Sequence, residues 1–268
     1  MTGWEDLLDE AEGLWQEGRH HDALQACDRA ALQGEDARYY AAIMRGDILL
    51  ELGDAPGALS SFESVADPDV ADPDVDLSRG VALFELGRFA EAENALRSAQ
   101  RGDANLAEAH YTLGLIAELQ GTGAEAEHFR QARKLDAELY APRPQIGREE
   151  FEKIVEEALE SLPDRVAGVV RNVPVLVAEL PHPDDLRLAD PPLSPRSLGL
   201  FVGLPPRAIS SLDAPAIEQP TILLFKRNLE RACRDRDELV REVNLTVVHE
   251  VGHALGLSEE DLEERGLQ

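Results

Sequence analysis

The sequence predicts a multidomain fold, in which an all-α solenoid of repeated helix pairs over residues 1–140 precedes a small α+β domain over residues 148–268. Three observations lead to this prediction. Small residues recur every 34 to 35 positions through the first half. The second half instead mixes helical and strand-like patterns, which favours an α+β domain. The proline-bearing stretch 141–147 lies between the two and is expected to be a linker.

Four successive units in the first half share one register of small residues. The glycines expected in turns are Gly18, Gly53, Gly87 and Gly121. Two further series keep the same spacing, namely Ala11, Gly46, Gly80 and Gly114, and Ala23, Ala58, Ala92 and Ala126. Because a glycine can adopt the left-handed conformation that ends a helix, each unit is expected to read helix, tight turn, helix. The pattern resembles the tetratricopeptide repeat, with four units over about residues 4–140, although Phe129 comes one position early in the fourth.

A tandem acidic stretch over residues 67–75 lies between the second and third units. It carries four aspartates and two prolines, a composition that favours a solvated loop. Metal binding by these aspartates is the minor alternative.

Periodicity also assigns the elements of the second half. Apolar residues at helical spacing predict an amphipathic helix over about 148–162. The remaining expected elements are strands over 173–180, 198–202 and 221–225, a loop over 181–197, and helices over 227–234 and from 237 to Gly256. Pro174 places the first strand at a sheet edge or close to its own beginning. One group of basic residues is expected to form a solvated helical surface: Lys226, Arg227, Arg231, Arg234, Arg236 and Arg241.

The string His249-Glu250-Val251-Gly252-His253 carries the chemistry expected of the chain. Residues four apart on a helix lie on one face, so His249 and His253 can turn imidazole nitrogens toward one metal ion. Glu250 lies beside the first histidine, where its carboxylate can reach a water on the metal. This is the H-E-x-x-H pattern of zinc metallopeptidases, with two histidine ligands and a glutamate as general base.

Two histidines leave such a metal short of ligands, so a third protein ligand is expected. Gly256 ends the helix and lets the chain reverse, and Glu259 follows three residues later. The spacing H-E-x-x-H-x-x-G-x-x-E resembles the metzincin pattern with glutamate in place of the third histidine. Glu259 is therefore the expected third ligand. The alternatives are Glu260, Asp261 and Glu263.

Residues 148–268 resemble the bacterial zincin-like metallopeptidase family of minimal matrixin-like domains. The resemblance rests on four segments, 151–163, 228–233, 246–253 and 260–266. It implies a compact domain that holds one Zn²⁺ per chain through His249, His253 and Glu259, with Glu250 as the base. This chain departs from the pattern in two ways. It has glutamate where the family usually has aspartate, and its two methionines both lie in the repeats, so the methionine turn of larger metzincins is missing.

These residues predict a zinc-dependent metallopeptidase that hydrolyses peptide bonds through a metal-activated water, with Glu250 as general base. The group that would stabilise the oxyanion is left open, because residues 141–268 contain no tyrosine. The candidates are His182, Arg207 and Arg227, although His182 is expected to be solvated and the arginines to pair with acids. The alternative is a non-catalytic zinc-binding scaffold for protein–protein interaction.

The chain is strongly acidic, with 53 acidic against 26 basic residues and a net charge of −27. This charge argues against nucleic acid and anionic membranes as partners. Residues 1–140 hold 29 acidic and 11 basic residues, a net of −18. A groove formed by the repeats is therefore expected to receive a basic protein partner, besides the peptide or protein substrate of the second domain. The chain has two cysteines and no recognisable signal sequence, so the cytoplasm is the expected location.

Overall fold

The computed structural model describes residues 3–66, 72–163, 173–187, 192–203, 220–258 and 261–262. The chain divides into two compact units. The first comprises residues 1–141 together with 183–195, and the second comprises residues 142–182 and 196–268. The stretch 183–195 thus groups with the repeats, although it lies in sequence inside the region expected to form the second domain.

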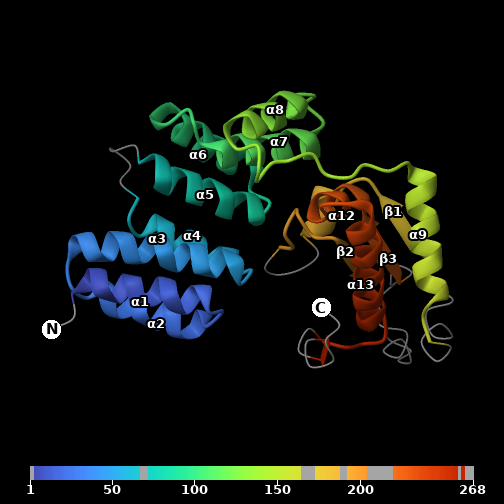
Figure 1. The fold of residues 1–268 in the computed structure, drawn as a ribbon, viewed down its shortest axis with the longest axis horizontal. Helices are drawn as coiled ribbons and strands as arrows, with labels where there is room; N and C mark the ends of the chain where they lie inside the picture. Colours follow the sequence, from blue (N-terminus) through green and yellow to red (C-terminus); the bar gives the residue numbers. More distant parts are fainter. Residues whose placement is uncertain are drawn as a thin grey trace, which may run out of the picture. The chain divides into compact units, whose positions relative to one another are not determined.

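Paired helices build the first unit (Figure 1). Their bounds are α1 Trp4–Gln16, α2 His20–Ala31, α3 Glu35–Glu51, α4 Ala55–Glu63, α5 Pro73–Glu85, α6 Phe89–Gly102, α7 Ala107–Gln120 and α8 Glu125–Leu135. The turn within each pair contains one of the four expected glycines. Their φ angles are +75°, +77°, +66° and +64° for Gly18, Gly53, Gly87 and Gly121. The left-handed turns and the helix-pair repeat are therefore as the sequence predicts.

The second glycine series lets the two helices of a pair touch. A methyl group added at each of these glycines would collide with a large side chain on the partner helix, which is why only glycine fits. The contacts are Gly46 with Phe62 at 2.3 Å, Gly80 with Leu96 at 2.6 Å, and Gly114 with Phe129 at 2.6 Å from the added carbon.

The fourth unit departs from the fixed period. The alanines of the third series are fully buried in the first three units, whereas Ala126 is exposed. A second glycine with positive φ, Gly123, follows Gly121, and α8 begins only at Glu125. The packed face of α8 is consequently displaced, and Phe129 meets Gly114 from the early position noted in the sequence.

The structure describes the acidic stretch only from Asp72 onward. Residues 67–71 lie outside the described chain, and from Asp72 onward the loop prediction is wrong. The Asp72 carboxylate accepts hydrogen bonds from the backbone N–H groups of Asp74 (3.1 Å) and Val75 (3.3 Å) and so caps α5. The Tyr39 hydroxyl also donates to it. Asp72 therefore has a structural role.

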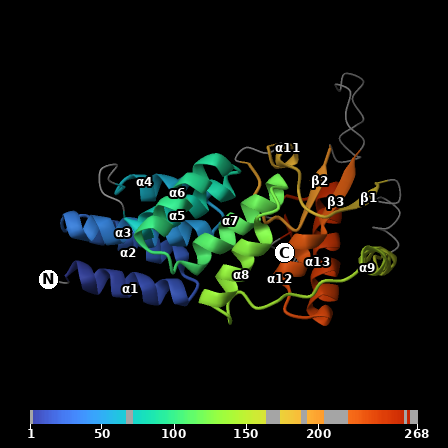
Figure 2. The same cartoon turned by 90° about the horizontal axis from the view of Figure 1, so that it is seen from above.

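In the described part of the second unit, helices lie on one side of a small sheet (Figure 2). The strands are β1 Val175–Ala178, β2 Gly199–Val202 and β3 Thr221–Phe225, and the helices are α9 Arg148–Glu160, α12 Lys226–Ala232 and α13 Arg236–Ala254. The strand order is β1-β3-β2, with β1 parallel and β2 antiparallel to β3. The sequence ranges agree closely with these bounds, and β1 lies at an edge of the described sheet, in agreement with the prediction from Pro174. The expected loop 181–197 contains one short helix, α11 Pro183–Leu186, which groups with the first unit.

A single hydrophobic core lies between the helices and the sheet of the second unit. Alternate residues of β3, Ile222 and Leu224, are fully buried, as expected for a strand with one face covered. Phe151 of α9 and Val243 of α13 meet them in the same cluster. The core therefore holds α13, the helix that carries the histidines, rigidly against the strands.

The basic group at 226–241 is not wholly a solvated surface, and at Lys226 that expectation is wrong. Lys226 and Glu230 are only 4% and 2% exposed, and the Lys226 ammonium donates to Glu230 Oε1 at 2.7 Å. The same oxygen accepts the backbone N–H of Ile146 at 2.9 Å. A buried charge must be paired, and this pair also fixes the end of the linker to α12.

Candidate metal centre

Helix α13 positions the two expected histidine ligands, His249 and His253. Asp235 caps its beginning by accepting the backbone N–H of Glu238 at 2.8 Å. Leu239, Val243 and Val247 are buried at four-residue intervals, so one face of the helix is fixed in the core. This packing determines the rotation of the helix and therefore the direction in which the motif residues project.

The structure brings His249 and His253 together. Their rings lie 4.7 Å apart between centroids and almost perpendicular, and the two Nε2 atoms are 3.0 Å apart. Two nitrogen ligands at about 2.0–2.1 Å from a tetrahedral zinc ion would be separated by about 3.4 Å. The two imidazoles thus need to open by only a few tenths of an ångström to hold one ion. Their donor type and separation fit zinc.

The end of α13 orients the second histidine. Gly256 has a φ of +86°, its N–H donates to the His253 carbonyl (2.8 Å), and the Leu257 N–H donates to the Gly252 carbonyl (3.0 Å). These two bonds make a Schellman motif, which reverses the chain after the helix. The reversal places the Leu257 carbonyl 3.2 Å from His253 Nδ1. With a proton on Nδ1 to donate there, Nε2 keeps the lone pair that a metal requires.

Glu250 is buried between α13 and β2. Only 6% of this residue is exposed to solvent. A methyl group added at Gly199 of β2 would lie 2.9 Å from Glu250 Oε1. The same methyl group would lie 3.0 Å from the Thr246 side chain. Gly199 therefore provides the space that Glu250 occupies. Sequence reasoning did not single out this glycine, although a glycine inside a short strand can mark a close approach.

The third ligand stays a prediction, because Glu259, Glu260 and Glu263 lie outside the described residues. The chain that flanks Glu259 is described and turns back on α13. Fully buried Leu262 packs where a side chain on Gly252 would otherwise be, 2.4 Å from the added carbon. Across the described ranges, no cluster of three or more His, Cys, Asp or Glu side chains is arranged to hold a metal.

Asp261, one of the alternative ligands, has a capping role. Its Oδ2 accepts hydrogen bonds from the Ser258 backbone N–H (3.0 Å) and hydroxyl (2.9 Å), and Ser258 Oγ accepts the Asp261 N–H (3.2 Å). This reciprocal pattern is a capping box, which begins a helical turn at Ser258. Glu259 is the first residue after that cap in sequence.

The structure describes two of the three candidate oxyanion groups, His182 and Arg227. His182 is exposed, and Arg207 lies outside the described residues. Arg227 pairs with two acids, Glu179 at 3.4 Å and Glu230 at 3.6 Å, which agrees with the pairing expected for it.

Family comparisons agree with this architecture. The tetratricopeptide repeat model matches residues 8–74 and 77–144, about half of the chain. The chain therefore belongs to the tetratricopeptide-repeat proteins. A second model, described as zincin-like metallopeptidase, matches residues 170–267. The repeats are thus followed by a zincin-like metallopeptidase domain, whose matched range includes the stretch 183–195 that groups with the repeats.

No curated protein matches the chain significantly. Among solved structures, one titled "Crystal structure of MamA" is similar at a TM-score of 0.44 and 16% identity, over 51% of this chain and 80% of that one. Within the described residues, no helix has both the length and the apolar character needed to cross a membrane.

Proposed function

We propose that the chain is a zinc-dependent metallopeptidase whose repeats recruit a protein partner or substrate. The observation that carries this proposal is the pair of Nε2 atoms 3.0 Å apart, beside a buried Glu250, within a zincin-like metallopeptidase domain. His249, His253 and Glu259 would hold one Zn²⁺ per chain. When bound, the ion polarises a peptide carbonyl and lowers the pKa of the attacking water to about 7.

Glu250 is proposed to move the proton in this reaction. Its carboxylate accepts the proton of the attacking water and returns it to the leaving amine. Burial against Gly199 holds the carboxylate in one position, which general-base catalysis needs. The two histidines are proposed to act only as ligands, and the His253 Nδ1 bond to the Leu257 carbonyl would fix the tautomer of that ring.

Strand β2 is proposed to receive the substrate. It is an edge of the described sheet, paired on one side with β3, and its Gly199 touches Glu250. An extended peptide that added to this edge would run past the carboxylate. Both cysteines are free, and burial raises the pKa of Cys27 and of Cys233 to about 11, so neither thiol is proposed to act as a nucleophile. A cytoplasmic location remains our proposal.

The test compares wild type with Glu250→Gln, and uses Glu242→Gln on the same helix as a matched control. Each protein is assayed for zinc content and for cleavage of a fluorogenic peptide library. We expect about one zinc per chain in all three, and cleavage by wild type and the control alone. Equal cleavage by Glu250→Gln would remove Glu250 as the base. Zinc without cleavage in wild type would favour the alternative, a non-catalytic zinc-binding interaction scaffold.

A further inference from the structure

An open cavity of about 640 Å³ lies between α1 and α3 in the first unit. Its volume is within the range of sites that bind small molecules or peptide side chains, about 300–1,000 Å³. Its lining includes Glu12 and Trp15 of α1, and Tyr40, Asp47 and Glu51 of α3. They come from the first helices of two neighbouring repeats.

Aromatic rings in fixed orientations form part of the cavity wall. The Trp15 indole N–H donates to Glu51 Oε2 at 2.6 Å, which holds both side chains. Tyr40 stacks on Trp4 with ring centroids 5.7 Å apart and planes within 4°. Such rings present faces that attract a cation.

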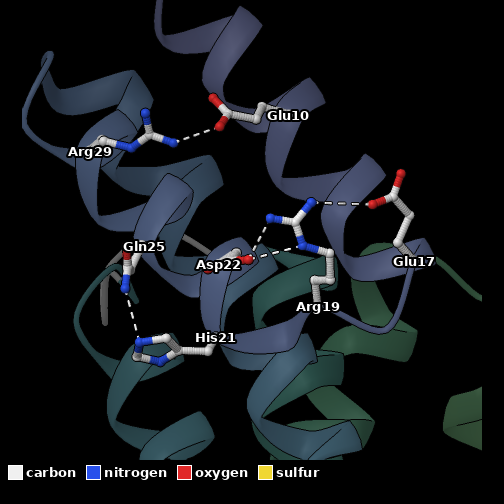
Figure 3. Close-up of polar contacts among 7 residues, drawn as sticks. All are labelled: Glu10, Glu17, Arg19, His21, Asp22, Gln25 and Arg29. Carbon is white, nitrogen blue, oxygen red and sulfur yellow. Dashed lines mark hydrogen bonds and ion pairs between the residues drawn. The ribbon is translucent and has the colours of Figure 1, made fainter.

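Two of the cavity carboxylates, Glu12 and Asp47, have no ion pair within the described residues, whereas Glu51 pairs with His20 at 3.2 Å. Figure 3 shows two paired acids of the same unit: Glu10 pairs with Arg29 at 2.9 Å, and Asp22 pairs with Arg19 at 2.6 Å. In the described part of the chain, by contrast, no lysine or arginine forms an ion pair with a cavity carboxylate. These carboxylates are Glu12, Asp47 and Glu51.

Asp47 is the most exceptional of the three. It has neither a hydrogen bond nor an ion pair within the described residues, and it is partly buried. Burial, together with the charge of Glu108, raises its pKa to about 6. A partly desolvated carboxylate without a partner lowers the stability of the fold. An incoming cation would remove that cost.

We propose that this cavity binds an arginine side chain of a basic peptide, with the guanidinium against the Trp15 and Tyr40 rings and paired with Asp47. Arginine fits better than lysine, because its planar guanidinium group can stack on aromatic rings and can also donate two parallel hydrogen bonds to one carboxylate. The inference deepens the recruiting role given to the repeats under the proposed function, and rests on it. It specifies one pocket and one side-chain chemistry.

The test is a calorimetric titration of the full chain carrying Glu250→Gln, so that the peptide cannot be cleaved by the proposed reaction. The probe is acetyl-Ala-Arg-Ala-Arg-Ala-amide, compared with the same peptide containing lysine or glutamine in place of arginine. We expect the arginine peptide to bind tightest and the glutamine peptide to bind at least tenfold more weakly. Asp47→Asn should weaken the arginine peptide at least tenfold. Asp22→Asn, which removes an acid paired with Arg19, should leave binding unchanged.

Equal affinity of the Asp47→Asn and parent proteins would overturn the site, as would the absence of binding. Equal affinity of the lysine and arginine peptides would overturn the assignment to a guanidinium. Failure of the zinc peptidase proposal would be seen separately, in zinc content and cleavage, because this titration requires neither.

Discussion

Replacing Gly199 with alanine tests how Glu250 is held. The added methyl group would lie 2.9 Å from Glu250 Oε1 and 3.0 Å from the Thr246 side chain. Ordinary contacts of this kind begin near about 3.5 Å, so Glu250 has to retreat by about 0.5 Å. The backbone of Gly199 does not have a positive φ, so alanine causes no conformational strain of its own.

The size of the effect follows from that displacement. Forcing a methyl group into a packed site costs about 1–3 kcal/mol of unfolding free energy. A misplacement of about 1 Å reduces catalysis on the order of a hundredfold, so about 0.5 Å predicts a loss of roughly tenfold in kcat/KM. Zinc content should not change, because neither histidine is touched.

Chemical denaturation of four proteins measures the effect without a known substrate. These are wild type, Gly199→Ala, Glu250→Ala and the double variant. With Glu250 shortened, the methyl group meets only Thr246, so Gly199→Ala should cost at least about 1 kcal/mol less there than in wild type. Gly147→Ala, at a glycine with open space around it, is the matched control. If Gly199→Ala costs the same with and without the Glu250 side chain, the described contact is refuted.

Three further predictions follow from particular contacts. Gly46→Ala should lower the unfolding free energy by about 1–3 kcal/mol in thermal or chemical melts, since its methyl group would lie 2.3 Å from the Phe62 ring; a melt unchanged from wild type would contradict the close packing of α3 on α4. In the folded state the pKa of Asp47 is raised from 3.8 to about 6. Between these two pH values the folded state binds more protons than the unfolded state. The free energy of unfolding therefore falls as pH rises through this window, by at most about 3 kcal/mol. Asp47→Asn should flatten the pH dependence of stability between pH 4 and 6 and raise stability at pH 7, and an unaltered profile would show that the carboxylate is well solvated. Glu259→Ala should weaken zinc retention in dialysis against a chelator, relative to Glu242→Ala, and retention equal to the control would transfer the ligand role to Glu260, Asp261 or Glu263.

The repeats were largely predictable from sequence because their constraints are local. A turn glycine such as Gly87 requires a left-handed backbone, and Gly80 is required by one side chain, Leu96, on the next helix. Each of these two requirements places a glycine at a fixed spacing in the sequence. The period failed at Ala126, where an additional glycine turn shifted α8, a change that a fixed spacing cannot represent.

The candidate site was only partly predictable, because some of its contacts join distant segments. The pairing of His249 with His253 follows from helix geometry alone. The space that Gly199 leaves for Glu250 depends on how β2 packs on α13, and the burial of Lys226 depends on Glu230 and the linker. Neither the space at Gly199 nor the burial of Lys226 can be predicted from the residues next to it in sequence. The third ligand is still the prediction made from spacing.

Zinc titration of the metal-free chain tests the central claim most directly. Stoichiometry is measured by calorimetry, and thermal melting is recorded with zinc at a hundredfold excess over its dissociation constant, where binding should stabilise the fold by about 2.7 kcal/mol. The account predicts one zinc per chain and a higher melting temperature for wild type and for His182→Ala, an exposed histidine outside the motif, and loss of both effects in His253→Ala. A wild-type chain that takes up no zinc, or a His253→Ala chain that binds it as tightly as wild type, would contradict the account.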